Sequence, residues 1–185
     1  MKAVFGLGNP GLAYALTRHN VGFQAVDLYR KVHRLKKKGR IESSALVYSH
    51  NDLLLVKPMT YMNASGPAVR GVLQRHGLSP ADAIVVHDDL DLAFGRIRVL
   101  EGGGPGSHNG MRSVVRALQT DSIPRLRVGI EQEGRTKIGR DYVTDRFTSD
   151  EWQRIVPVLE EVVRAIDVVR DEGLQAAMNR FNRRD

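Results

Sequence analysis

The sequence predicts an α/β fold, a single three-layer α/β/α domain in which helices cover both faces of a central twisted sheet. Short apolar runs alternate along the chain with longer segments in which apolar residues recur at helical spacing. The length of 185 residues suits one hydrophobic core and is short for two domains of usual size. Because such alternation builds sheets covered on both faces, we expect a mixed, mostly parallel sheet and treat residues 1–185 as one domain.

The strands are predicted at short β-rich runs bounded by turn-forming residues. The first covers residues 2–7, and residues 41–57 hold two further β-rich stretches separated by the turn-like sequence His50-Asn51-Asp52. Later runs predict strands at residues 83–87, 96–100 and 126–130.

The helices are predicted where apolar residues recur every three or four positions. Such patterns run from Val21 to Leu35, from Ala68 to Leu73 and from Met111 to Leu118. The longest helix should begin at Thr148, because Thr148 and Glu151 have the spacing of a capping box. It should end at Gly173, before a short basic C-terminal helix.

The composition favours an acidic partner. Lys and Arg number 28 against 21 Asp and Glu, a net charge of +7 that suits nucleic acid or a membrane surface, although ordinary surface charge explains it as well. Without cysteine the chain has no disulfide, thiolate nucleophile or Cys-ligated zinc. The N-terminus lacks the features of a signal peptide, and no apolar run is long enough to span a membrane. We therefore expect a cytoplasmic protein with no membrane contact.

Four loops are the expected ligand-binding elements, because ligands in α/β sheets bind beyond the carboxyl ends of the strands. They are Gly8 to Asn20, Pro58 to Gly66, Asp88 to Gly95 and Gly102 to Gly110. The first overlaps a glycine pattern, Gly6 to Gly11, that fits the dinucleotide-binding fingerprint weakly. Pro10 lacks an N–H for a pyrophosphate, and the next helix starts only near Asn20. A tight turn is the simpler interpretation.

His19 is the candidate general base. It closes the first loop at a predicted helix N-terminus, whose positive end disfavours an imidazolium and suits a neutral imidazole held by a carboxylate. Asp88, after the strand at 83–87, would supply that carboxylate. His33, His50 and His76 lie on surface-like segments and are interpreted as structural.

Water is the predicted nucleophile. Neither Ser65 nor Ser107 has the spacing of a nucleophilic serine, and cysteine is absent. The neutral amides of Asn63 and Asn109 would position the substrate carbonyl and the water.

We expect neither a metal nor a cofactor. No histidine pair has zinc-binding spacing. The acids Asp88, Asp89 and Asp91 leave magnesium as an alternative, but no phosphate-binding GxxxxGK[ST] loop accompanies them.

Six motifs together carry a family resemblance. GLGNPG, TRHNVGF, PMTYMNASG, VHDDLDL, GGGPGSHNG and RLRVGI stand in the order and approximate spacing found in bacterial peptidyl-tRNA hydrolases, from residue 1 to about residue 180. The resemblance implies hydrolysis of the ester between a peptide's C-terminus and the 3′ ribose of tRNA, which recycles tRNA from stalled or dropped-off translation products. It also implies an α/β/α domain that is usually monomeric and needs no cofactor.

The resemblance assigns roles to matching positions. His19 becomes the catalytic base and Asp88 the group that stabilises and orients it. Asn9 is similar to the residue that distinguishes a peptide amide from a free α-amino group. The other matches to substrate-contacting residues are Tyr14 on the tRNA side, Met62 in the peptide groove, Tyr61, Asn63 and Asn109.

The tRNA clamp is the part that departs from the family pattern. Arg127 matches a position associated with the tRNA 5′ phosphate. Relatives commonly carry basic residues just before the glycine-rich loop, where this chain has Leu100-Glu101. Arg96 and Arg98 are the expected substitutes, with Arg112 and Arg116 as further candidates.

Three alternatives stay open at this point. The glycine pattern is also compatible with a nucleotide-cofactor enzyme, which would bind NAD or FAD. The charge leaves a non-catalytic RNA-binding module, although exposed aromatics for base stacking are few. The three acids leave a metal-dependent hydrolase acting on RNA.

Overall fold

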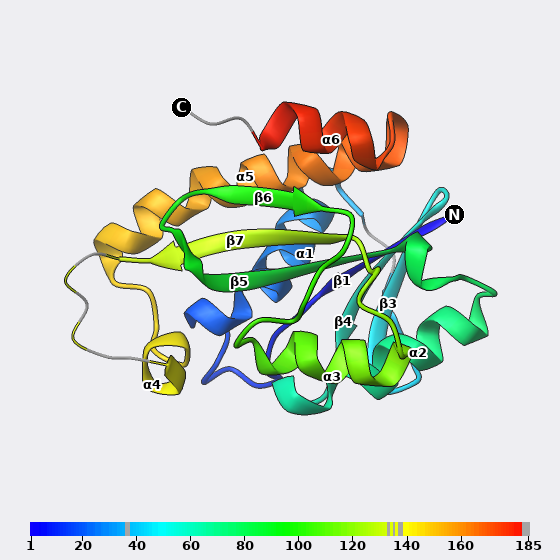
Figure 1. Cartoon of the computed structure of the whole chain (residues 1–185), viewed down its shortest axis with the longest axis horizontal. Helices are drawn as coiled ribbons and strands as arrows, with labels where there is room; N and C mark the ends of the chain where they lie inside the picture. Colours follow the sequence, from blue (N-terminus) through cyan, green and yellow to red (C-terminus); the bar gives the residue numbers. More distant parts are fainter. Residues whose placement is uncertain (36–37, 133, 135, 137–138, 183–185) are drawn as a thin grey trace.

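A twisted seven-stranded sheet runs through the molecule (Figure 1). The computed structural model describes residues 1–35, 38–132, 134, 136 and 139–182. In spatial order the strands are β2 (Arg40–Glu42), β3 (Ala45–His50), β4 (Leu53–Pro58), β1 (Lys2–Gly6), β5 (Ala83–Ala93), β7 (Arg125–Glu131) and β6 (Ile97–Leu100).

The sheet is parallel at its centre and antiparallel at its edges. Strand β1 pairs in parallel with β4 and β5, and β5 pairs in parallel with β7. The β2–β3–β4 pairings on one side and the β6–β7 pairing on the other are antiparallel. The prediction of a mixed, mostly parallel sheet is thus confirmed.

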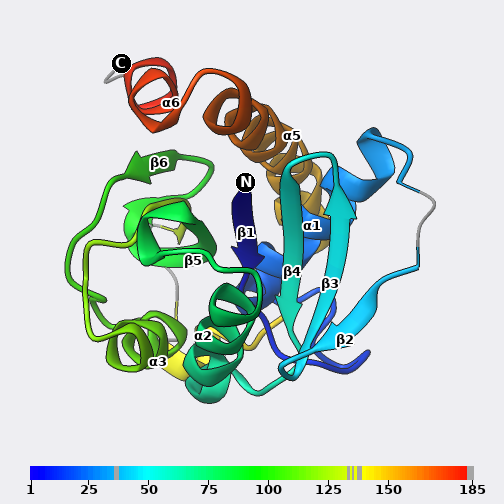
Figure 2. The same cartoon turned by 90° about the vertical axis from the view of Figure 1, so that its right-hand side faces the viewer.

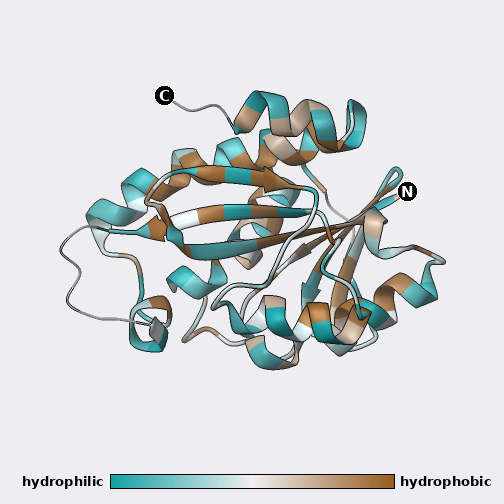
Figure 3. Ribbon diagram, in the orientation of Figure 1, coloured by the Kyte–Doolittle hydropathy of each residue, from teal (hydrophilic) through white to brown (hydrophobic). Residues whose placement is uncertain are grey.

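Helices cover both faces of the sheet, as Figure 2 shows. The helices α1 (Val21–Val32), α5 (Ser149–Asp171) and α6 (Leu174–Phe181) pack on one face, while α2 (Ser65–Arg75) and α3 (Asn109–Leu118) pack on the other. Successive strand residues point to opposite faces. Val4 and Val86 therefore belong to the core under α1 and α5, and Phe5 and Val85 to the core under α2 and α3. Figure 3 shows the resulting apolar strands between amphipathic helices.

The longest helix begins as predicted. Thr148 Oγ1 accepts a hydrogen bond from the Glu151 N–H at 3.2 Å, and Glu151 Oε2 accepts one from the Thr148 N–H at 2.6 Å. This reciprocal pair is the predicted capping box. Gly173, with φ of +95°, separates α5 from α6. Despite its 23 residues α5 is too charged to cross a membrane, and no other described helix is long and apolar enough.

Three local differences from the sequence prediction have physical causes. The segment after His87 is not a loop, because β5 keeps pairing with β7 and runs on to Ala93 around a bulge. The first β-rich stretch is two strands, β2 and β3, joined by Ser43 and Ser44 with positive φ. The short helix α4 (Gly139–Val143) and the 3₁₀ turns η1 (Arg18–Asn20), η2 (Met62–Ala64) and η3 (Pro80–Asp82) were not predicted, since so few residues give no periodicity.

Close packing of α1 on β1 explains two of the glycines. A Cβ at Gly6 would lie 2.1 Å from the Gly22 carbonyl oxygen, and one at Gly22 would lie 2.3 Å from the Leu7 nitrogen. Only hydrogen fits at such a crossing. The approach brings the start of α1, and the η1 turn before it, to the carboxyl end of β5. Gly6 therefore has a packing role, which favours the structural interpretation of the first glycine pattern.

Candidate active site

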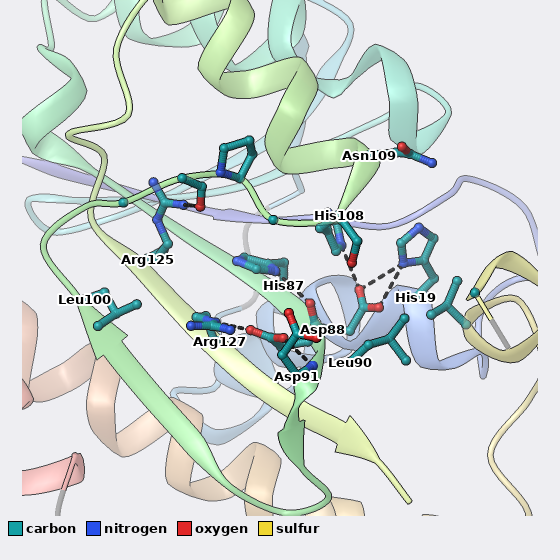
Figure 4. A pocket seen from close by; sticks show the side chains of 18 of the residues that line it. His19, His87, Asp88, Leu90, Asp91, Leu100, His108, Asn109, Arg125 and Arg127 are labelled. Carbon is teal, nitrogen blue, oxygen red and sulfur yellow. Dashed lines mark hydrogen bonds and ion pairs between the residues drawn. The ribbon is translucent and has the colours of Figure 1, made fainter. Parts of the chain in front are cut away.

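Asp88 lies on β5 just beyond the point where β5 stops pairing with β1. The pairing of β1 with β5 ends at Gly6 and Val86, while β5 continues. Beyond this point side chains from both helical layers reach the strand. His19, from η1 before α1, places Nδ1 at 2.9 and 3.0 Å from the two Asp88 oxygens, and His108, just before α3, places Nε2 at 2.9 Å from Oδ1 (Figure 4).

The hydrogen bonds assign the imidazole protons. His108 Nδ1 accepts a bond from the Met111 N–H at 3.2 Å and so caps α3. Its proton must then sit on Nε2, which donates to Asp88. His19 likewise donates Nδ1–H to Asp88, and the lone pair of the neutral ring is left on Nε2. His19, which lines the pocket, therefore carries its basic nitrogen on the side away from Asp88.

The charges of the cluster reinforce this arrangement. Burial raises the pKa of Asp88, but the charges and hydrogen bonds of His19 and His108 outweigh it and hold that pKa well below its usual range. Burial lowers the pKa of His19, whereas the charge and hydrogen bond of Asp88 raise it, and the net pKa lies above its ordinary value. Asp88 is thus a permanent carboxylate that favours the imidazolium as His19 gains a proton.

A pocket of about 460 Å³ opens beside this pair. Of the predicted site residues, four line it: His19, Asp88, Asn109 and Arg127. The glycine-rich segment Gly102–Gly106 covers one side. The pocket therefore joins the candidate base in η1, and its carboxylate partner on β5, to an arginine on β7.

The other predicted substrate-contacting residues lie on the loops after β1 and β4, outside the pocket lining. Asn9 Oδ1 accepts a hydrogen bond from the Met62 N–H at 2.8 Å, so the two loops are joined. Met62 is buried, whereas Asn63 and Tyr61 are exposed, Tyr61 at 64%. Tyr14 is half-buried, and its carbonyl accepts a hydrogen bond from Thr17 Oγ1.

The three predicted clamp arginines gather on the β6–β7 side. Arg127 lines the pocket and forms an ion pair with Asp89 through Nε. Arg98 is directly opposite Arg127 in the β6–β7 pairing and is exposed. Arg96 is exposed in the turn between β5 and β6. Of these three predicted clamp arginines, only Arg127 lines the pocket.

Comparison with known proteins identifies the family. Residues 3–185 match the sequence profile described as peptidyl-tRNA hydrolase. This chain belongs to the peptidyl-tRNA hydrolase family. Similar relatives are the peptidyl-tRNA hydrolases of Chloroflexus aggregans, 45% identical over 98% of this chain and 99% of that protein, and of Thermotoga petrophila, 44% identical over 97% of this chain and 96% of that protein.

A solved structure agrees in fold as well as in family. The crystal structure of peptidyl-tRNA hydrolase from Acinetobacter baumannii superimposes with a TM-score of 0.89 at 31% identity, covering 98% of this chain and 94% of that one. The predicted three-layer α/β/α fold and the predicted family are both confirmed.

One group of described residues has the composition of a metal site. His19, Asp88 and His108 offer ligand atoms within 4.8 Å of one another. Both imidazoles face the same carboxylate at hydrogen-bonding distance, so N–H···O bonds account for the geometry. The magnesium alternative fits less well, because Asp88 is held by the two histidines and Asp89 by Arg127.

His108 and His87 line the pocket, and the sequence prediction missed both. His108 stands in the SHNG motif, of which only Asn109 was selected, and its place directly before a predicted helix was the available signal. The sequence predicts His87 at the end of the strand over residues 83–87. Its burial at 4% exposure agrees with that, but its ring lies in the pocket wall.

Proposed function

We propose that this chain hydrolyses the ester between the peptide C-terminus and the 3′ ribose of peptidyl-tRNA, using a water molecule activated by His19. The bond from His19 Nδ1 to Asp88 at 2.9 Å carries the proposal. It holds the ring in one tautomer and leaves Nε2 as a base at the pocket. Membership of the peptidyl-tRNA hydrolase family supports the choice of substrate.

In the proposed reaction His19 Nε2 takes a proton from water as the oxygen attacks the ester carbonyl. Asp88 stabilises the imidazolium that forms. The tetrahedral intermediate then breaks its bond to the ribose oxygen, which receives the proton from His19. A well-placed base of this kind contributes on the order of 10²–10⁴-fold. The Asn109 amide, at the pocket, would position the carbonyl or the water without adding charge.

The groups on the two sides of the His19–Asp88 pair differ in charge, and so do the two parts of the substrate. The loops after β1 and β4 supply neutral groups, Asn9 and Asn63, with Met62 and Tyr61 nearby. Strands β7 and β6 supply Arg127 and Arg98. Peptidyl-tRNA joins a largely neutral peptide to a polyanion. We therefore place the peptide on the asparagine side and the acceptor stem with its 3′ CCA end on the arginine side.

Two roles follow from this placement. Asn9 would hydrogen-bond the peptide amide, so that a free α-amino group leaves its partner unsatisfied and ordinary aminoacyl-tRNA is spared. Arg127, with Arg98 and Arg96, would bind backbone phosphates, a contact without sequence information. As the family resemblance implies, we further propose that the enzyme acts as a monomer, in the cytoplasm where its substrate forms.

Hydrolysis of N-acetyl-aminoacyl-tRNA, beside unblocked aminoacyl-tRNA, tests the proposal. Wild type should cleave the blocked substrate preferentially, and His19→Ala should lose at least about two orders of magnitude in rate. His50→Ala is the matched control, since His50 lies at the far end of β3. A near-normal rate for His19→Ala would refute the mechanism, and no cleavage by wild type would refute the function.

A further inference from the structure

His87 has a buried nitrogen without a protein partner. The side chain is 4% exposed, and Nε2 is fully covered but makes no hydrogen bond among the described residues. A buried polar atom left unpaired is costly, so such atoms call for an explanation. The mechanism proposed above does not use this residue.

The other ring nitrogen determines what Nε2 can do. His87 Nδ1 lies 2.7 Å from the backbone carbonyl oxygen of Asp88. A carbonyl only accepts, so Nδ1 must carry a proton. Burial, together with the neighbouring His108, holds the pKa of His87 well below its usual range, and the ring is neutral. Nε2 is therefore an acceptor and can only be satisfied by a donor.

The place of His87 indicates which part of a ligand would donate. The ring lines the pocket next to His108, with 4.7 Å between the ring centroids (Figure 4). On the strands, His87 is opposite Arg127, which is opposite Arg98. Residues paired across neighbouring strands project to the same face of a sheet. His87 thus begins a row that continues with two arginines, on the side of Asp88 away from Asn9 and Asn63.

We propose that His87 Nε2 accepts a hydrogen bond from a hydroxyl or amino group on the nucleotide part of the substrate. The inference rests on the proposed function, which places the tRNA end on this side. Arginines bind phosphates but cannot accept a hydrogen bond. His87 supplies the complementary acceptor, for a ribose hydroxyl or a base amine, within one pocket. It is a binding residue for the nucleotide and takes no part in proton transfer.

Binding of nucleotides without an ester tests this role separately from catalysis. The probes are deacylated tRNA and the trinucleotide CCA, with adenosine to show whether the terminal nucleoside alone makes the contact. His87→Asn keeps an N–H near the position of Nδ1 and deletes the acceptor at Nε2, whereas His87→Gln restores an amide there. His50→Asn is the matched control, because His50 is the last residue of β3 and lies outside the pocket lining.

We expect His87→Asn to bind tRNA and CCA about tenfold more weakly, as loss of one hydrogen bond predicts. Its melting temperature should stay close to that of wild type, and His87→Gln should recover part of the affinity. Unchanged affinity in His87→Asn would overturn the inference. So would a loss that accompanies a lower melting temperature and that Gln does not lessen, because that pattern marks a structural role. Failure of wild type to hydrolyse peptidyl-tRNA would instead overturn the proposed function, and the two failures are distinguishable.

Discussion

At the scale of single residues, Asp88 organises the candidate site because two histidines share its carboxylate. His108 is fixed from both sides, by the Met111 N–H on Nδ1 and by Asp88 on Nε2. Its position in turn limits where Asp88 can point. The carboxylate therefore faces His19 in one orientation before any substrate binds. Such preorganisation costs no rearrangement during the reaction.

The Asp88→Asn variant should change both the rate and its pH dependence. Activity requires neutral His19, so kcat/KM falls as the pH drops through the pKa of His19. Asp88 raises that pKa, and removing its charge should move the acid limb to lower pH. The amide also presents N–H groups to the imidazoles and disfavours the productive tautomer, so the plateau should fall by about two to four orders of magnitude.

The measurement is kcat/KM for N-acetyl-aminoacyl-tRNA from pH 5 to 9 in wild type and variant. Asp91→Asn is not suitable as a control, because Asp91 is exposed but also lines the pocket. Asp52→Asn, in the turn after β3, is the better one. An acid limb with the same midpoint in Asp88→Asn would contradict the assignment of that limb to His19.

At the scale of elements, glycines without a Cβ allow the helix backbones to pack directly against the sheet and against one another. Gly22 touches β1 and β5, and Gly66 in α2 touches α3, where a Cβ would lie 2.0 Å from the Ser113 carbonyl oxygen. The Gly66 N–H also donates to Ser113 Oγ at 2.9 Å. His19 and Asn109 stand at the starts of α1 and α3. These contacts therefore fix the positions of His19 and Asn109 relative to β5.

The Gly22→Ala variant should be destabilised through this contact. A methyl group would lie 2.4 Å from the Val86 carbonyl oxygen and 2.3 Å from the Leu7 nitrogen. Both are backbone atoms, which cannot move without displacing the strand. We expect a loss of about 3 kcal/mol in the free energy of unfolding, measured by urea denaturation. Gly104→Ala is the control, since a Cβ there meets nothing within 4 Å. Equal stability of the two variants would show that α1 can shift without cost.

The helices and strands themselves were largely predictable, because their signals are local. The apolar period of α3, the capping box at Thr148 and the turn at Asn51 each need only a few neighbouring residues. The continuation of β5 was not predictable. Its acidic sequence after His87 is typical of a loop, and only pairing with β7, about 40 positions later, makes it a strand.

At the scale of the whole molecule, polar contacts between distant segments join the layers. Tyr29 in α1 donates to Asp167 in α5 at 2.8 Å, and Asn182 after α6 bonds both backbone groups of Val99 on the edge strand β6. The pair of His19 with Asp88 could be proposed from sequence because a family pattern and two crevice loops indicated it. Contacts such as these could not, since no local pattern specifies which distant polar residues meet.

A second long-range polar contact holds the turn that carries His19. Arg18 is 5% exposed and Glu151 6% exposed, and Arg18 Nη2 donates to both Glu151 oxygens at 2.6 and 2.7 Å. Arg18 Nη1 also donates to the carbonyls of Tyr142, Asp145 and Arg146. The η1 turn is thereby attached to the segment before α5. Glu151 serves twice, because the same carboxylate completes the capping box of α5.

Glu151→Gln should separate these two roles. Glutamine also suits the capping box, so the helix start can persist while the buried Arg18 loses its counter-charge. Breaking a buried pair in this way costs about 3 kcal/mol, measured as the free energy of unfolding at pH 7. Asp150→Asn is the control, an exposed acid in the same helical turn. A variant as stable as this control would show that the ion pair contributes nothing.

The pH dependence gives an independent test of the same pair. Burial raises the pKa of Glu151, but the Arg18 and Thr148 hydrogen bonds and the Arg18 charge outweigh it, and the net pKa is lowered from 4.5. A carboxylate with a lowered pKa stabilises the fold above its unfolded pKa, and this stability is lost as the pH falls through its folded pKa. Wild type should therefore lose stability below about pH 4.5 more steeply than Glu151→Gln. If the two proteins lost stability in parallel as the pH falls, other carboxylates would account for the acid sensitivity. The η1 turn would then be held by the hydrogen bonds from Arg18 to the backbone carbonyls.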